Sequence, residues 1–202
     1  MNQEGLLSGI LTGAKGTDGL RKATHQTLIN ANYLLARLKA HYKILHTNEH
    51  GRCAHEFIID LRPFSPLGIE ASDVAKRLQD YGFHAPTMSW PVANTLMVEP
   101  TESESREELD RFVDALVSIR GEIREVEEGV AGREGNVLKM APHSIEDIVE
   151  GDGGGRWERE YGREKAAFPL PYLREKKFWP SVARVDDGEF CSPLGLDEVW
   201  VG

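Results

Sequence analysis

The sequence has little positive charge, and it lacks any long apolar run. Its 24 Lys and Arg residues face 33 Asp and Glu residues, which gives a net charge of -9. Binding nucleic acid regardless of sequence needs clustered Lys and Arg, and an anionic membrane attracts the same charges, so the composition argues against both partners. No stretch approaches the roughly 20 apolar residues that cross a bilayer. We therefore expect neither a nucleic-acid nor a membrane partner.

Cysteine is scarce as well. Cys53 and Cys191 are too few for a disulfide framework and lack the spacing of metal ligands. We expect both to be reduced thiols of an intracellular protein. Residues 1–10 lack the basic region and the unbroken apolar stretch of a signal peptide, and they are not Arg-rich like a transit peptide. The sequence therefore shows no targeting signal.

The sequence does contain a succession of helical and extended patterns. Apolar residues at spacings near 3.6 predict helices over residues 17–42 and 70–81, the second one capped by Gly82. Stretches of β-formers, each followed by a proline, predict strands over 53–61 and 95–99. A short extended piece over residues 87–90 lies between two further prolines. This order favours an α/β or α+β layer with a small sheet.

The clearest pattern is a helix that ends near Glu128, before Gly129. Its start is marked by two pairs that fit a capping box, Thr101 with Glu104 and Ser105 with Glu108. An apolar stripe follows and predicts the face that packs on the sheet: Leu109, Phe112, Leu116, Ile119, Ile123 and Val126. We expect Phe112 to be buried within that face.

Beyond Gly129 the character of the chain changes. The glycine-rich residues 151–155 are typical of a flexible linker, and several prolines interrupt regular structure. A disordered tail would be poorer in aromatic residues than this one, which contains Trp157, Tyr161, Phe168, Tyr172, Phe178 and Trp179. We therefore predict an extended arm over residues 130–202. It should pack either on its own domain or on the remainder of a larger protein.

Three stretches of the sequence are candidates for common binding or catalytic motifs, and none matches its motif. Residues 9–17 are rich in glycine, but glycine follows Lys15 and no strand precedes it, unlike a Walker A loop. Four histidines between residues 41 and 55 lack the spacing of zinc ligands, so we expect no metal site. Cys53 and His55 would share one face of a strand, where an imidazole can lower the pKa of a thiol, but chance explains this pair better.

The most distinctive stretch runs from Tyr81 to Pro91. A turn between prolines carries His84, Thr87 and Ser89, a candidate wall for a polar pocket. The alternative is a structural turn in which each polar group is hydrogen-bonded within the domain. Both interpretations remain open on the residues alone.

Together these stretches resemble the C-terminal domain of glycine decarboxylase, the P-protein of the glycine cleavage system. The resemblance runs in order from about Gly16 to Asp186 and rests on Asn30-Ala-Asn-Tyr33, Arg52-Cys-Ala-His-Glu56, Asp60-Leu-Arg-Pro63, Asp73-Val-Ala-Lys-Arg-Leu78, Tyr81 to Pro91, Glu99-Pro-Thr-Glu-Ser-Glu104, Pro169-Leu-Pro171, Lys177-Phe-Trp-Pro180 and Val182-Ala-Arg-Val-Asp186. Residues 1–15 are only loosely similar, and the ending after Asp186 diverges. The division implied is a domain over 16–129 followed by the arm over 130–202.

The resemblance implies the small C-terminal domain of aspartate-aminotransferase-like (fold type I) pyridoxal-phosphate enzymes. The family enzyme is a homodimer that decarboxylates glycine and passes the aminomethyl group to the lipoyl arm of the H-protein. In this fold type the small domain closes over the cofactor face of a large domain. His84, Thr87 and Ser89 would then line the substrate channel. The compartment implied is the mitochondrion in a eukaryote and the cytoplasm in a bacterium.

The family's Schiff-base lysine lies in a His-Lys pair followed by a glycine-rich run, and no lysine here has that context. We therefore expect no catalytic residue in this chain and no pyridoxal phosphate bound by it alone. Three hypotheses follow. The chain is the C-terminal portion of glycine dehydrogenase (aminomethyl-transferring) and is inactive alone, or it is a non-catalytic binding or regulatory module. In the third, it is a subunit that completes the enzyme in trans with a partner chain carrying the large domain.

Overall fold

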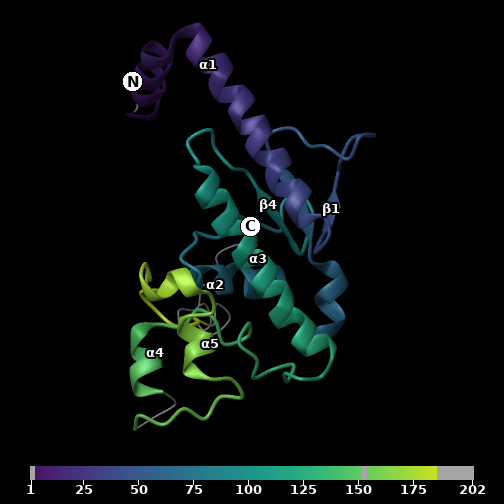
Figure 1. Cartoon of the computed structure of the whole chain (residues 1–202), viewed down its shortest axis with the longest axis vertical. Helices are drawn as coiled ribbons and strands as arrows, with labels where there is room; N and C mark the ends of the chain where they lie inside the picture. Colours follow the sequence, from purple (N-terminus) through teal and green to yellow (C-terminus); the bar gives the residue numbers. More distant parts are fainter. Residues whose placement is uncertain (1–2, 152–153, 186–202) are drawn as a thin grey trace, which may run out of the picture.

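The computed structural model describes residues 3–151 and 154–185, and it contains a small antiparallel sheet packed with helices (Figure 1). The strand order is β1–β2–β4–β3, formed by β1 (Lys43–Leu45), β2 (Phe57–Asp60), β4 (Thr95–Val98) and β3 (Thr87–Met88). The long helices are α1 (Gln3–Leu38), α2 (Ala71–Asp80) and α3 (Arg106–Glu127). The expected α/β class, a small sheet packed with helices, is confirmed.

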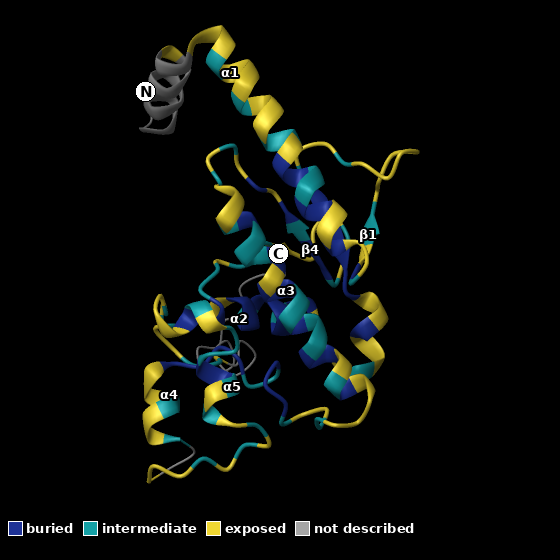
Figure 2. Cartoon of the chain, in the orientation of Figure 1, coloured by how far each residue is buried: buried dark blue, intermediate teal, exposed yellow. Residues whose placement is uncertain are grey.

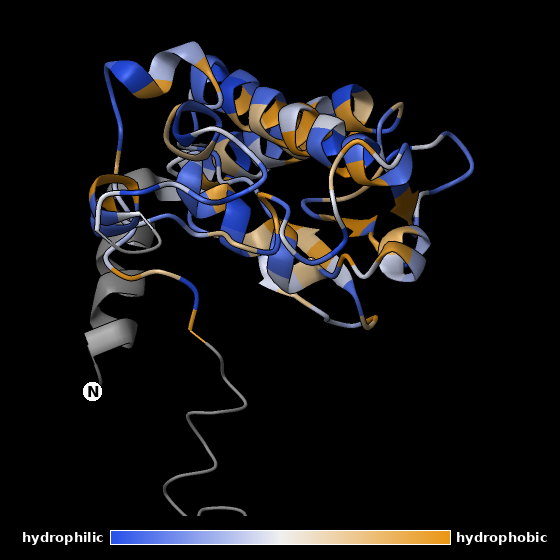
Figure 3. Cartoon of the chain, turned by 90° about the horizontal axis from the view of Figure 1, so that it is seen from below, coloured by the Kyte–Doolittle hydropathy of each residue, from blue (hydrophilic) through white to orange (hydrophobic). Residues whose placement is uncertain are grey.

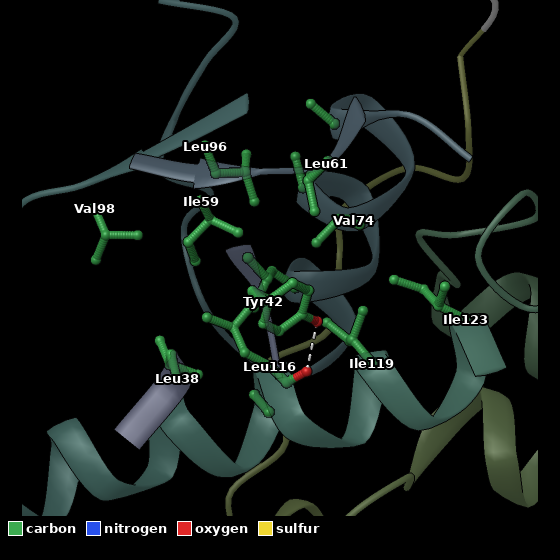
Figure 4. Close-up of a cluster of buried hydrophobic side chains, with 14 of the residues drawn as sticks. Leu38, Tyr42, Ile59, Leu61, Val74, Leu96, Val98, Leu116, Ile119 and Ile123 are labelled. Carbon is green, nitrogen blue, oxygen red and sulfur yellow. Dashed lines mark hydrogen bonds between the residues drawn. The ribbon is translucent and has the colours of Figure 1, made fainter. Parts of the chain in front are cut away.

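The core lies between the sheet and the helices (Figure 4). Phe57 and Ile59 of β2 pair with Val98 and Leu96 of β4, and all four face this core. Side chains in a strand alternate between faces, so one face of the sheet supplies these residues. The buried Tyr42 hydroxyl donates to the Leu116 carbonyl at 2.7 Å. Its polar end is therefore satisfied inside the core.

Helix α1 differs at both ends from the prediction over residues 17–42. It begins at Gln3 and contains a break at Gly16, whose backbone (φ 59, ψ -178) is one that glycine adopts far more readily than other residues. It ends at Leu38, and residues 39–41 form a turn. The C-terminal part of α1 packs on the body, where Ala31, Leu34, Leu35 and Leu38 are buried, and the N-terminal half of its backbone projects (Figures 1 and 2). In the described part of the chain, no helix is both long and apolar enough to cross a membrane.

The other predicted elements match the structure unevenly. Helix α2, helix α3 and strand β4 agree with the prediction to within about one residue, and Gly82 and Gly129 follow α2 and α3 with positive φ, 78° and 70°. The strand predicted over 53–61 is wrong at its start, because β2 begins at Phe57. Strand β1 was not predicted, since three residues are too short to show a period of two.

The start of α3 confirms part of the predicted capping. Ser105 is the N-cap, and its hydroxyl accepts a hydrogen bond from the Glu108 amide at 3.2 Å. The reciprocal half is missing, because the Glu108 carboxylate binds Arg111 instead. Thr101 is not part of a box, since its hydroxyl contacts that of Ser103. A neighbouring arginine therefore competes successfully with the backbone for a capping glutamate.

Phe112 corrects the prediction for the apolar stripe of α3. Leu109, Leu116, Ile119, Ile123 and Val126 are buried as predicted, but Phe112 is half-buried and Val113 faces the core in its place. The reason is that Phe112 lines an open groove, which no described element covers. Figure 3 shows that the strands consist mainly of hydrophobic residues, whereas the helices contain both hydrophobic and hydrophilic residues.

This partial exposure predicts a modest cost for truncation. Phe112→Ala should destabilise the chain by roughly half of the 3–5 kcal/mol of a fully buried phenylalanine, whereas Ile119→Ala should cost about 2–5 kcal/mol. Ile119 is the matched control, since it lies on the same helix and is 0% exposed. Urea unfolding of both variants measures the difference. A Phe112→Ala variant less stable than Ile119→Ala would contradict this account of the groove.

The segment after Gly129 packs on the rest of the chain. It contains the short helices α4 (Ile145–Glu150) and α5 (Arg163–Ala167) and the 3-10 turn η2 (Pro171–Arg174), and a further turn, η1 (Arg62–Leu67), follows β2. Side chains from the segment are buried: Val137, Leu138, Ala141, Ala166, Ala167 and Leu173. Of the two surfaces considered, residues 130–151 and 154–185 therefore cover their own chain, chiefly α2 and α3. The last part of the arm predicted over 130–202, residues 186–202, lies outside the described residues.

Candidate functional site

A groove of about 520 Å³ lies where α1, α3 and the β3–β4 hairpin meet. Most of its lining is apolar, formed by Leu34, Phe83, Ala85, Pro86, Met97, Val98, Pro100, Leu109 and Phe112. The polar lining consists of His84, Thr87, Glu99, Glu104 and Glu108. An apolar cleft with a few convergent polar groups is the usual form of a ligand site.

Two of the three predicted site residues lie in this groove. His84 and Thr87 both line it and are exposed. Ser89 is exposed too, but it belongs to the hairpin turn: its amide donates to the Thr95 carbonyl at 2.9 Å, and its hydroxyl accepts from the Asn94 amide at 3.2 Å. Its part in a substrate channel stays a prediction. Sequence reasoning missed Met97 and Glu104 as lining residues and assigned Phe112 to the core.

The end of α2 directs the chain into the groove. The Phe83 amide donates to the Leu78 carbonyl at 3.0 Å, and the Gly82 amide donates to the Gln79 carbonyl at 2.9 Å. These two bonds, with positive φ at Gly82, form a Schellman motif. The predicted cap at Gly82 thus sets the direction in which the next residues, including His84, leave the helix.

Carboxylates dominate the charge of the groove. Glu108 forms a bidentate pair with Arg111, one bond of which measures 2.9 Å. Glu99 lies 3.9 Å from the imidazole of His55. Among the residues that the structure describes, no lysine or arginine lines the groove itself. Because Glu108 is paired with Arg111, the acidic character of the lining rests on Glu99 and Glu104, and it favours an apolar ligand with positive charge over an anion such as phosphate.

A second polar cluster, around Arg77, is fully buried. The Arg77 guanidinium donates to Glu122 at 2.6 and 3.0 Å, to Asp80 at 2.9 Å, and to the carbonyls of Lys165 and Ala166 at 2.8 and 3.0 Å. Burial alone would lower the pKa of Arg77, but the charges of Glu122 and Asp80 outweigh it and raise that pKa. This cluster therefore binds α5 firmly to α2 and α3.

His143 extends the same cluster into the later part of the chain. Its backbone amide and its Nδ1 contact the Asp80 carboxylate at 2.7 and 2.8 Å, and its Nε2 lies 2.8 Å from the Tyr161 hydroxyl. Burial raises the pKa of Asp80, but the hydrogen bonds from His143 and the charge of Arg77 leave it lowered. Its members bind one another and are mostly buried, so the cluster acts as a structural junction between α2, α3 and the later segment.

The remaining candidate groups do not form a site. Cys53 is a free thiol outside β2, so it does not share a strand face with His55, and burial raises its pKa. Across residues 3–151 and 154–185, no three His, Cys, Asp or Glu side chains come together as metal ligands. Lys177 is half-buried, and burial lowers its pKa to about 8. Its Nζ donates to the Asp80 carbonyl at 2.5 Å and so caps α2.

Comparison with known proteins decides the family. A family model described as glycine dehydrogenase, C-terminal domain, matches residues 23–143, which include every residue of the groove. The chain belongs to this family. The resemblance seen in the sequence is therefore confirmed, and the domain's α2, α3 and sheet lie within the match.

Relatives extend the glycine dehydrogenase match along most of the chain. The human mitochondrial glycine dehydrogenase (decarboxylating) is 58% identical over 174 residues, 85% of this chain and 17% of the relative. The bacterial protein of the same name from Christiangramia forsetii is 58% identical over 172 residues, 85% of this chain and 17% of its own length. That of Nostoc punctiforme is 50% identical over 198 residues, 95% of this chain and 20% of its own length. The chain thus spans about a fifth of these relatives.

Proposed function

We propose that this chain acts as the C-terminal portion of a glycine dehydrogenase (decarboxylating) and is inactive without the portion that the longer relatives carry. The observation that carries this proposal is the family match over the groove, in a chain a fifth as long as its relatives. The whole enzyme would use pyridoxal phosphate, form a homodimer and deliver an aminomethyl group to the lipoyl H-protein. It would work in mitochondria, as the human relative's name states, or in the cytoplasm of a bacterium.

The residues of this groove do not fit pyridoxal phosphate. Its phosphate would meet Glu99 and Glu104, and the guanidinium of Arg111 beside the groove is already paired with Glu108. A phosphate site needs backbone amides or cationic side chains directed at it. The cofactor and its lysine would therefore belong to the other portion of the enzyme, and the groove would serve the substrate side.

The chemistry of the groove suits an apolar chain that bears a protonated amine. Its apolar lining would hold the hydrocarbon part, and its carboxylates would attract the amine. The lipoyl arm carrying an aminomethyl group has both features. His84 and Thr87, the exposed polar groups on the hairpin side, would orient this arm or glycine as channel-lining residues. Orientation of this kind contributes to rate without any covalent step.

The test is substitution of the two groove residues in an intact family enzyme. Changes equivalent to His84→Ala and Thr87→Ala should lower glycine turnover by roughly 10- to 100-fold, because reacting groups would be misplaced. Both side chains are exposed, so the melting temperature should change by no more than about 2 °C. His50→Ala is the matched control, an exposed histidine outside the groove. Loss of folding with unchanged specific activity would make the turn structural.

A further inference from the structure

The wall of the groove is in contact with the distant segment after Gly129. Phe83 and Phe112 both line the groove, and their rings meet edge to face with centroids 5.2 Å apart. The Arg111 guanidinium lies 4.0 Å from the centre of the Phe83 ring and 5.2 Å from that of Tyr172 in η2. Arg111 therefore bridges an aromatic ring of the groove wall and one of the later segment.

Hydrogen bonds join the same partners at the end of α2. The Tyr81 carbonyl, just before the Schellman turn, accepts the Tyr172 hydroxyl at 2.9 Å and Arg111 Nη1 at 3.4 Å. A carbonyl at a helix end has no partner within the helix, so these donors satisfy it. Burial raises the pKa of Tyr172 to about 12, so its hydroxyl keeps the proton that it donates.

Glu108 fixes Arg111 from the other side. Its carboxylate receives the guanidinium in a bidentate pair, and Glu108 itself lines the groove. Burial opposes the charge of Arg111, but the hydrogen bonds and charge of Glu108 raise its pKa nevertheless. The guanidinium thus contacts two rings and a carboxylate at the same time, a combination that a lysine ammonium cannot reproduce.

We propose that Arg111 and Tyr172 are positioning residues that set the orientation of the groove wall from Phe83 to Thr87. Through them, residues 171–174 determine the shape of a groove about 90 residues earlier in the sequence. The inference deepens the proposed function and rests on it for the role of the groove. The contacts themselves are independent of any activity.

The experiment uses the 202-residue chain with 13C-methyl methionine. Met97 lines the groove, whereas Met140 lies outside it and serves as an internal reference. Tyr172→Phe keeps the ring and removes only the hydroxyl; it should move the Met97 methyl resonance and leave that of Met140 in place. Exchange of the Phe83 amide should become roughly five- to tenfold faster, the effect of one ordinary hydrogen bond. Arg111→Lys should move the same signals while keeping the charge.

The matched control is Tyr161→Phe, which removes a hydroxyl of the same segment bonded to His143, away from the groove. It should leave the Met97 resonance and the Phe83 exchange rate as they are. Unchanged signals in Tyr172→Phe, or equal changes in both variants, would overturn the proposal and leave Tyr172 with general stability alone. Because no turnover is measured, this outcome is distinguishable from failure of the proposed function, which would appear as full activity of the His84→Ala enzyme.

Discussion

Replacing Arg77 with methionine should lower the free energy of unfolding by about 3–5 kcal/mol, because it leaves Glu122 and Asp80 buried without their counterion. The side chains of Arg77 and Asp80 are 0% exposed, so water cannot take the place of the lost donors. The carbonyls of Lys165 and Ala166 lose their donor in the same step. Urea unfolding measures the loss, and amide exchange should show it first in residues 137–177.

Two further variants separate charge from packing. Arg37→Met removes the pair with Asp110, but Arg37 is 45% exposed, so the unfolding midpoint should barely move. Adding Glu122→Gln to Arg77→Met should restore part of the lost stability, since one uncompensated charge disappears. If Arg77→Met proved no more harmful than Arg37→Met, the buried cluster would not be the junction between α2 and α5.

Pyridoxal phosphate added to the purified chain should form no stoichiometric adduct that borohydride fixes, and the mixture should release no carbon dioxide from glycine. Among the described residues, the groove lining offers the phosphate the carboxylates of Glu99 and Glu104, and Arg111 beside it is paired with Glu108. No lysine has the sequence context of the family's Schiff-base lysine. Mass spectrometry of peptides after borohydride treatment measures the first outcome. Release of labelled carbon dioxide measures the second.

Lys177 is the lysine whose chemistry could most readily contradict this prediction. Burial lowers the pKa of Lys177 to about 8, and a lysine with a lowered pKa forms Schiff bases readily. Its Nζ is, however, bonded to the Asp80 carbonyl. A full-length relative, treated in the same way, is the positive control. A pyridoxyl group found on Lys177 at one per chain would contradict the prediction.

The sequence predicts the fold best where a local rule applies. Ser105, Gly82 and Gly129 end or begin helices for reasons contained within four residues, and all three lie where the pattern places them. Strand β1 could not be predicted, because its three residues are too few to show a periodic pattern. Phe112 fits the helical stripe, but periodicity does not tell whether another element covers that position. Local rules thus fix the elements, and packing decides their exposure.

The groove was only partly predictable for the same reason. His84 and Thr87 stand out on either side of Pro86, and both line the groove. Glu104 has a local explanation near a helix start, so its place in the groove emerges only when α1, α3 and β4 meet. Arg77 and His143 are 66 positions apart in the numbering, yet both contact Asp80. A pattern read along the chain contains no signal for such partners.

A chimera tests most directly the proposal that this chain acts as the C-terminal portion of a glycine dehydrogenase. The matching fifth of the Christiangramia forsetii enzyme, 58% identical, would be replaced by this chain, and glycine decarboxylation measured against the parent enzyme. We predict turnover of the same order as the parent, lost by a large factor when His84→Ala is added. A chimera that folds and binds pyridoxal phosphate but does not decarboxylate glycine would contradict the claim.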